Sequence, residues 1–205
     1  LLPAEGNQRF RKTEESRRLE YLALETCDYK IQYRDNSELV LILGGDMIEG
    51  QLGHDMRAGA PLIEQKVAFW KYFSAMIGLF AMRYPRVRII ARPGNHKHDI
   101  ARHPGRATAS KWDGHEWGMY YALMMMCSQL KNVTWDLDLK PWAIIDLHGH
   151  KALSTHADTD IKLGSPLTKA EANYAQLVMT STLKTYGESF ESAYIAHFHS
   201  AVAVP

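Results

Sequence analysis

The sequence lacks the features that mark membrane and secreted proteins. Its uncharged apolar runs are short, and residues 73–82 for example span about half of the roughly 20 residues that a membrane-spanning helix needs. Its first residues show no basic segment followed by an apolar stretch and a small-residue cleavage site, the pattern of a secretory signal. These absences predict a protein that does not cross a membrane and works in the cytoplasm.

Cysteine is also scarce. Cys27 and Cys127 are the only two, and both fall in helix-like segments without the paired spacing of a metal site. Disulfides are rare in reducing compartments, and a free cysteine packs as a small apolar residue. We therefore expect both side chains to be reduced and buried. With 205 residues, of which 46% are apolar, the chain can bury one sizeable core, and we predict a single domain over residues 1–205.

The net charge is only +1, so the chain as a whole does not indicate a polyanionic partner. Its distribution is less even, because residues 83–111 carry an excess of basic side chains with Asp99 as the only acid. The basic residues are Arg83, Arg86, Arg88, Arg92, Lys97, Arg102, Arg106 and Lys111. Such a stretch raises the local concentration of anions and suits a phosphate-rich substrate. An ordinary solvated surface with an excess of arginine is an equally good interpretation.

Helical and strand patterns alternate along the chain. Residues 13–33, 61–80, 117–130 and 167–186 have helical spacing or composition, and we expect the run Met124-Met125-Met126 to fill the core. Short apolar runs predict strands at residues 39–43, 87–91, 133–137, 142–147, 150–155 and 192–196. The order predicts an α+β fold with α/β-like layers.

Polar side chains of metal-binding type follow four of these strands. Asp46, Asn95, His156 and His197 each lie just beyond a predicted strand end, which is the edge where open α/β sheets bind ligands. His199 lies two residues after His197, so both imidazoles point to the same side of an extended backbone. Carboxylate, amide and imidazole donors without thiolate suit manganese, iron or zinc better than a structural zinc site.

The segments that carry these side chains resemble the motifs of the calcineurin-like metallophosphoesterases. They are, in order, Gly44-Gly45-Asp46, Gly94-Asn95-His96, Thr155-His156 and Ala196-His197-Phe198-His199. The family's fold is a four-layer β-sandwich flanked by helices. The chain is similar to phage-encoded DNA-repair exonucleases and to the nuclease subunits of double-strand-break repair complexes, which implies the host cytoplasm if a phage encodes it.

The resemblance implies a role for each motif residue. Asp46 would bridge two divalent metals, with manganese favoured, and Asn95, His156 and His197 would complete one site. His199 would belong to the other site. His96 would not bind metal but would donate a proton to the leaving oxygen, a step suited to an imidazole with a pKa near ~6.5. A pair of ions roughly 4 Å apart would activate the attacking water.

The sequence departs from the family in three places. The Asp-x-His motif that should precede the Gly-Asp strand is absent, since no histidine occurs before His54. We expect it upstream of Leu1, and further strands after Pro205. Lys97 stands where the family commonly has an acid, unless Asp99 takes that part. Ala196 replaces a glycine, which changes backbone freedom rather than metal binding.

A DNA phosphodiester is the favoured substrate, with His54, Arg92 and Lys97 expected to contact it. Protein phosphatases of the family carry Asp-Arg-Gly soon after the Gly-Asp motif, whereas Asp46 is followed here by Met-Ile-Glu-Gly. The alternatives are hydrolysis of nucleotides or small phosphodiesters, or a phosphomonoesterase. If one metal site is incomplete, the chain is instead a nucleic-acid-binding module without turnover.

Overall fold

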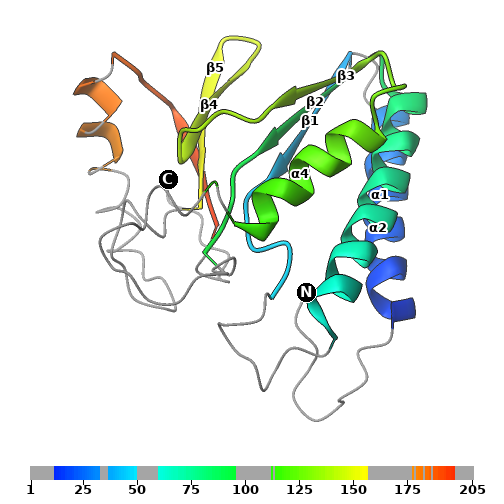
Figure 1. Ribbon diagram of the computed structural model, residues 1–205. Helices are drawn as coiled ribbons and strands as arrows, with labels where there is room; N and C mark the ends of the chain where they lie inside the picture. Colours follow the sequence, from blue (N-terminus) through cyan, green and yellow to red (C-terminus); the bar gives the residue numbers. More distant parts are fainter. Residues whose placement is uncertain are drawn as a thin grey trace.

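Helices and strands follow one another in the order that the sequence predicts (Figure 1). The computed structural model describes residues 12–32, 37–49, 60–95, 112, 114–156, 177, 179–181, 183–185 and 187–196. The helices with defined bounds are α1 (Lys12–Gln32), α2 (Leu62–Arg83) and α4 (His115–Met126). The strands are β1 (Glu38–Leu43), β2 (Arg86–Ala91), β3 (Val133–Asp136), β4 (Trp142–Leu147), β5 (His150–Thr155) and β6 (Ser192–Ile195). The predicted α+β class is confirmed.

The strands form two three-stranded sheets. In the first, β1, β2 and β3 run parallel, with Leu43 opposite Ala91 at the carboxyl ends of β1 and β2. In the second, β4 pairs antiparallel with β5, and β5 pairs parallel with β6, with Thr155 opposite Ile195. Parallel strands end at the same edge, so the segments that follow β1 and β2 emerge side by side, as do those that follow β5 and β6.

The strand β1 shows why the sheets stack into layers. Successive side chains of a strand point to opposite faces. Leu39, Leu41 and Leu43 join the core formed with the helices, whereas Val40 and Ile42 join the core between the two sheets. A strand buried on both faces has to be a continuous apolar run, which is what residues 39–43 provide.

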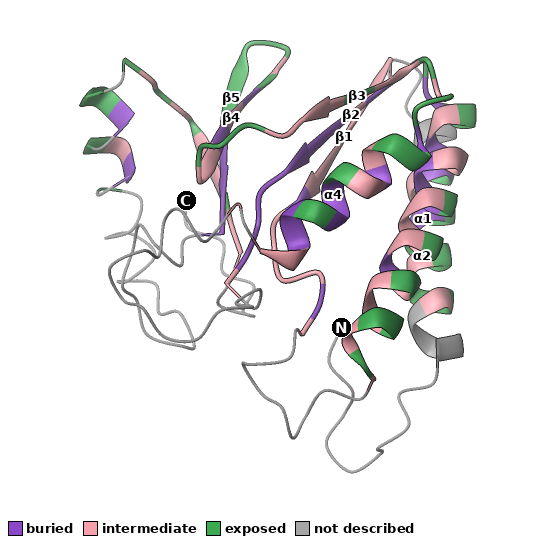
Figure 2. Ribbon diagram, viewed as in Figure 1, coloured by how far each residue is buried: buried purple, intermediate pink, exposed green. Residues whose placement is uncertain are grey.

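Each core lies between two layers. Helices α1, α2 and α4 cover one face of the first sheet, through buried residues such as Ile77 of α2 and Tyr120 of α4 (Figure 2). Ala143, Ile145 and Ala152 pack against Ile90 between the sheets. The outer face of the second sheet packs against helical residues within 177–185, which contribute the buried side chains of Met179 and Leu183.

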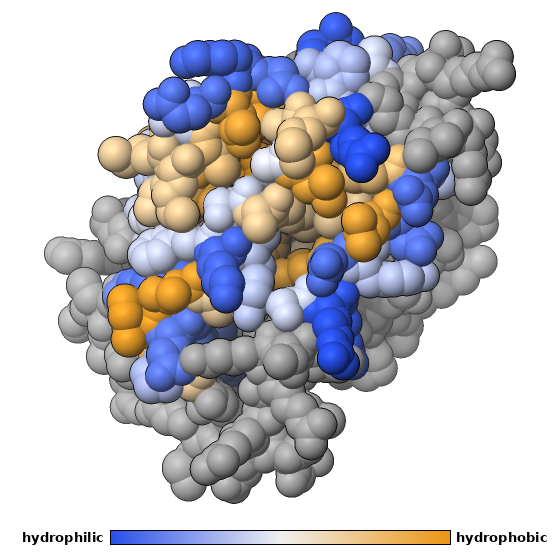
Figure 3. Space-filling model, turned by 90° about the vertical axis from the view of Figure 1, so that its right-hand side faces the viewer, coloured by the Kyte–Doolittle hydropathy of each residue, from blue (hydrophilic) through white to orange (hydrophobic). Residues whose placement is uncertain are grey.

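Three predictions from the sequence concern which residues and helices are buried or exposed. Cys27 and Cys127 are both buried and neither is in a disulfide, which confirms the expectation for both. Met125 and Met126 are 70% and 55% exposed, so the prediction that the methionine run fills the core is wrong for both, because α4 packs through its opposite side. No helix of the described chain is long and apolar enough to cross a membrane. Apolar and charged side chains intermingle on the face that α1 and α2 present (Figure 3).

The turn between β4 and β5 has only two residues between the strands. His148 (φ 56°) and Gly149 (φ 91°) both have left-handed backbone, the conformation that matches the twist of paired strands in a two-residue hairpin. The Asp146 side chain supports the turn, since its Oδ1 accepts the N–H of Gly149 at 2.7 Å. The predicted bounds of these two strands are confirmed.

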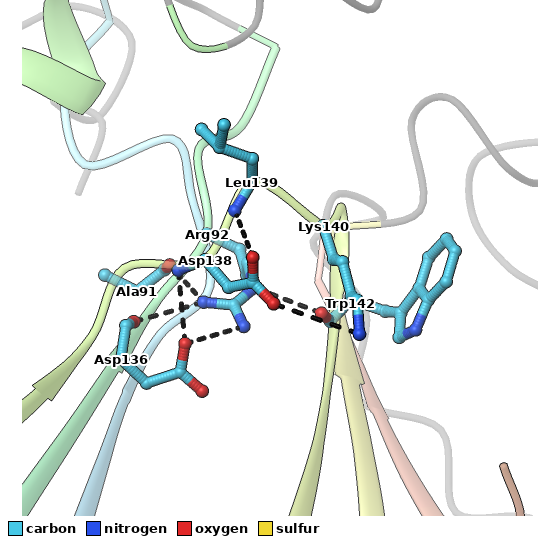
Figure 4. A network of polar contacts seen from close by, with 7 residues as sticks. All are labelled: Ala91, Arg92, Asp136, Asp138, Leu139, Lys140 and Trp142. Atoms are coloured by element: carbon cyan, nitrogen blue, oxygen red, sulfur yellow. Dashed lines mark hydrogen bonds and ion pairs between the residues drawn. The ribbon is translucent and has the colours of Figure 1, made fainter.

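Arg92 joins the two sheets where β2 and β3 end and β4 begins. Its side chain is 3% exposed. It donates to the carbonyl oxygens of Ala91, Asp136 and Trp142 at 2.8, 3.1 and 3.1 Å, and to Oδ1 of Asp136 at 2.9 Å. Figure 4 shows this network between the ends of β2 and β3 and the start of β4. A guanidinium with fixed planar donors is well suited to such a junction.

Candidate metal centre

The segments after β1, β2 and β5 meet at the edge where β1 and β2 end. A Cβ built on Gly45 would lie 2.5 Å from the backbone nitrogen of Gly94 and 2.7 Å from Nδ1 of His156. A Cβ built on Gly94 would overlap the backbone nitrogen and Oδ1 of Asp46. The contact between these segments therefore needs residues without a side chain at positions 45 and 94. Gly45 also has a φ of 92°, which other residues rarely adopt.

Three of the side chains that the sequence singles out converge here. Nε2 of His156 lies 3.1 Å from Oδ1 of Asn95 and 3.1 Å from Oδ2 of Asp46. The other carboxylate oxygen of Asp46, Oδ1, accepts the backbone N–H of Asn95 at 2.8 Å. His156 is 1% exposed, and Asp46 has a φ of 56°, a strained conformation that is often found at functional sites. The predicted proximity of these three residues is therefore present in the structure.

The hydrogen bonds define the protonation of His156. Its Nδ1 lies 2.7 Å from the carbonyl oxygen of Gly44, and because a carbonyl oxygen only accepts, Nδ1 carries a proton. Two states of Nε2 are then compatible with its position beside the oxygens of Asp46 and Asn95. Either it carries a second proton, or it directs a lone pair toward a cation shared with those oxygens.

The spacing of these donor atoms fits a metal ion. When each metal–ligand bond is about 2.1 Å, neighbouring ligands of an octahedral ion lie about 3.0 Å apart, close to the 3.1 Å that separates Nε2 from each oxygen. Among the residues that the structure describes, no three His, Cys, Asp or Glu side chains form a metal-type group. The candidate centre has two such side chains, His156 and Asp46, with Asn95 as the third donor.

Glu116, in the first turn of α4, is a member of the site that the sequence did not reveal. Its Oε1 accepts the backbone N–H of Met47 at 2.8 Å, and its Oε2 accepts that of Gly94 at 2.7 Å. The hydroxyl of Tyr120, one helical turn later, donates to Oε1 at 2.9 Å. Burial raises the pKa of the Glu116 carboxyl, and the two N–H groups oppose part of that shift. The one sign of this arrangement in the sequence is an acid four residues before a tyrosine in an apolar helix.

The remaining predicted residues have different outcomes. His54, His96, Lys97, His197 and His199 lie outside the described residues. The chain leading to His197 does reach the centre, because the Cβ of Ala196 is 3.3 Å from a Cβ built on Gly44.

Arg92, predicted to contact substrate, lies instead in the network between the sheets, where its donors bind protein oxygens. Arg88 is used in a similar way. It donates to Glu38 at 3.2 Å and to the carbonyl oxygen of Asp146 at 2.8 Å. In the described part of the basic stretch, these two arginines therefore serve the protein's own contacts. Arg83 and Arg86 are exposed.

No protein-family model, curated protein or solved structure matches this chain significantly. The chemistry of the centre is thus inferred from its own donors. A carboxylate, an amide oxygen and an imidazole nitrogen, all from loops that follow strands, form a compact and largely buried group with oxygen-rich character. Such a group suits a divalent cation such as manganese, iron or zinc.

Proposed function

We propose that this chain is a metal-dependent phosphoesterase of the calcineurin-like type that acts on a phosphodiester of DNA. The observation that carries the proposal is the meeting of Asp46, Asn95 and His156, from three loops, with donor spacings that suit one metal ion. The stacking of helices, two sheets and a further helical segment supports it, because the family's four-layer sandwich has the same order of layers.

The chain's own groups prepare this centre for metal. The carbonyl oxygen of Gly44 holds the proton of His156 on Nδ1, which leaves Nε2 for the metal. The N–H of Asn95 fixes one oxygen of the Asp46 carboxylate and leaves the other beside Nε2. When bound, a divalent pair supplies an activated water and neutralises charge on the phosphoryl oxygens. His197 and His199 remain the predicted further ligands, and His96 the predicted proton donor.

The preference for DNA as the substrate has a different basis from the proposal of metal binding. Arg88 and Arg92 are occupied within the protein, so the preference for DNA rests on the family resemblance and on the basic residues from Lys97 to Lys111. Nucleotides, small phosphodiesters and phosphomonoesters are the alternative substrates. Each of them requires the same centre, so the substrate question is separate from the question of metal binding.

The first experiment measures manganese binding by calorimetry and the manganese-dependent hydrolysis of four substrates. These are single-stranded DNA, a mononucleotide, bis(p-nitrophenyl) phosphate and p-nitrophenyl phosphate. We expect Asp46→Asn, which keeps the volume of the side chain, to weaken manganese binding and remove most turnover. His150→Ala is the matched control, because His150 is partly exposed and contacts Glu191 and Ser192 away from the centre.

The outcomes separate the candidate functions. Hydrolysis of both diesters but not of p-nitrophenyl phosphate supports a phosphodiesterase, and hydrolysis of the monoester alone supports a phosphomonoesterase. DNA binding without hydrolysis in the presence of manganese supports the nucleic-acid-binding module instead. Absence of manganese binding by the unmodified chain would overturn the proposal.

A further inference from the structure

The carboxylate of Glu116 lies between the two loops that supply Asp46 and Asn95. Each of its oxygens accepts an N–H from a residue directly next to a candidate ligand: Met47 follows Asp46, and Gly94 precedes Asn95. The donor–acceptor distances of 2.8 and 2.7 Å are those of charge-assisted hydrogen bonds. One side chain therefore connects two loops that are far apart in sequence, since Met47 and Gly94 are separated by 47 positions.

Helix α4 gives this carboxylate a fixed position. The carbonyl oxygen of Met119 accepts the indole N–H of Trp70 from α2 at 3.1 Å. The ring of Tyr120 packs edge-on against Phe69 of α2, with centroids 6.0 Å apart. A side chain on a helix that is packed in this way holds its partners more firmly than a loop residue does. The location of an acid in the first helical turn is also favourable, because the helix dipole is positive there.

We propose that Glu116 is a positioning residue that sets the separation of Asp46 and Asn95 for metal binding. The inference rests on the proposed function, since it assigns a purpose to the spacing of the donors. Glu116 acts on both ligands through the backbone, because it accepts the N–H groups of Met47 and Gly94. Groups that orient ligands in this way typically change metal affinity about 10–100-fold when they are removed.

Glu116→Gln is the sharpest variant. A glutamine amide has one accepting oxygen, so its NH₂ group must face either the N–H of Met47 or that of Gly94, and two donors then oppose each other. The volume of the side chain stays the same. We expect manganese affinity to fall about 10–100-fold. Tyr121→Phe is the control, because it removes a hydroxyl from a 42% exposed side chain of the same helix and leaves both loop hydrogen bonds in place, so manganese affinity should be nearly unchanged.

A measurement without metal tests the positioning itself. In ¹H–¹⁵N spectra of the metal-free chain, the amide protons of Met47 and Gly94 should resonate downfield and exchange slowly with solvent. In Glu116→Gln, at a temperature where near-ultraviolet circular dichroism shows native packing, at least one of them should move upfield and exchange faster. The unmodified chain alone already provides a test if the variant does not fold, since fast exchange of both amides in that chain would overturn the inference.

The combined results distinguish the two proposals. Weaker manganese binding together with altered amides in Glu116→Gln supports the positioning role. Unchanged manganese affinity in a folded Glu116→Gln overturns it. If the unmodified chain does not bind manganese but Glu116→Gln still releases the two amides, the phosphoesterase proposal fails, while the role of Glu116 in holding the two loops is supported.

Discussion

Gly94→Ala probes the closest approach in the candidate centre. An added Cβ would overlap the backbone nitrogen and Oδ1 of Asp46 and lie 2.7 Å from its Cγ. The backbone of Gly94 is not in the left-handed region, so alanine meets no conformational penalty there. Any destabilisation of the folded state therefore comes from the contact between the two loops.

The expected change in the free energy of unfolding combines two opposing effects. Alanine restricts the unfolded chain, which stabilises a protein by about 0.4–1 kcal/mol. Overpacking costs typically about 1–3 kcal/mol, and the upper part of that range applies because a backbone nitrogen cannot rotate away. The net loss is about 1–2 kcal/mol, or a fall in Tm of roughly 2–8 °C for a chain of this length. Displacement of Asp46 should also weaken manganese binding at least about tenfold.

Thermal and urea unfolding measure the first effect, and calorimetric titration with manganese measures the second. Gly118→Ala is the matched control, since Gly118 lies inside α4 and a Cβ there meets nothing within 4 Å. That variant should gain about 0.5–1 kcal/mol and bind manganese normally. A Gly94→Ala chain as stable as Gly118→Ala would show that the two loops do not approach as the structure has them.

Three further predictions concern stability. Arg92→Ala should cost at least about 2 kcal/mol in urea unfolding, because it removes a buried side chain that makes four hydrogen bonds at the junction of the sheets. The exposed Arg86→Ala should change stability by less than about 0.5 kcal/mol, and equal effects would contradict the inter-sheet role. Gly149→Ala should cost about 1–2 kcal/mol through its left-handed backbone, and an unchanged Tm would refute that conformation. Burial raises the pKa of Tyr84 above its usual value near 10, so the unfolded state ionises first. The unmodified chain should then lose stability above pH 10 relative to Tyr84→Phe, and parallel pH profiles would contradict this.

The arrangement of elements was predictable because its signals are local. A continuous apolar run can only be a strand buried on both faces or part of a buried helix, and its short length and flanking glycines favour the strand. The same logic explains why Asp46 and Asn95 could be expected together, since the parallel strands before them end at one edge. His156 belongs to the second sheet, and its approach to them depends on how the sheets stack, which the family resemblance implied and the residue pattern did not.

The roles of Arg92 and Glu116 were beyond a reading of the sequence for a physical reason. Both depend on partners 22 to 69 residues away. An arginine directly after a strand and close to candidate ligands has the pattern of an anion-binding residue, and only the packing of β4 against that strand end turns its donors inward. An acid in the first turn of a helix usually complements the helix dipole at the surface, and its place four residues before Tyr120 does not by itself indicate that two loops meet above it.

Arg92 and Glu116 also explain why the candidate centre lies where it does. Asp46 and Asn95 come from the first sheet and His156 from the second, so their donor spacing depends on the distance between the sheets as well as on each loop. The apolar core between the sheets, formed by Ile90, Ala143, Ile145 and Ala152, contributes to that distance. Arg92 fixes the sheets together at the same edge. Glu116 fixes the two loops of the first sheet, so the position of every donor is set by contacts that lie outside the donor group itself.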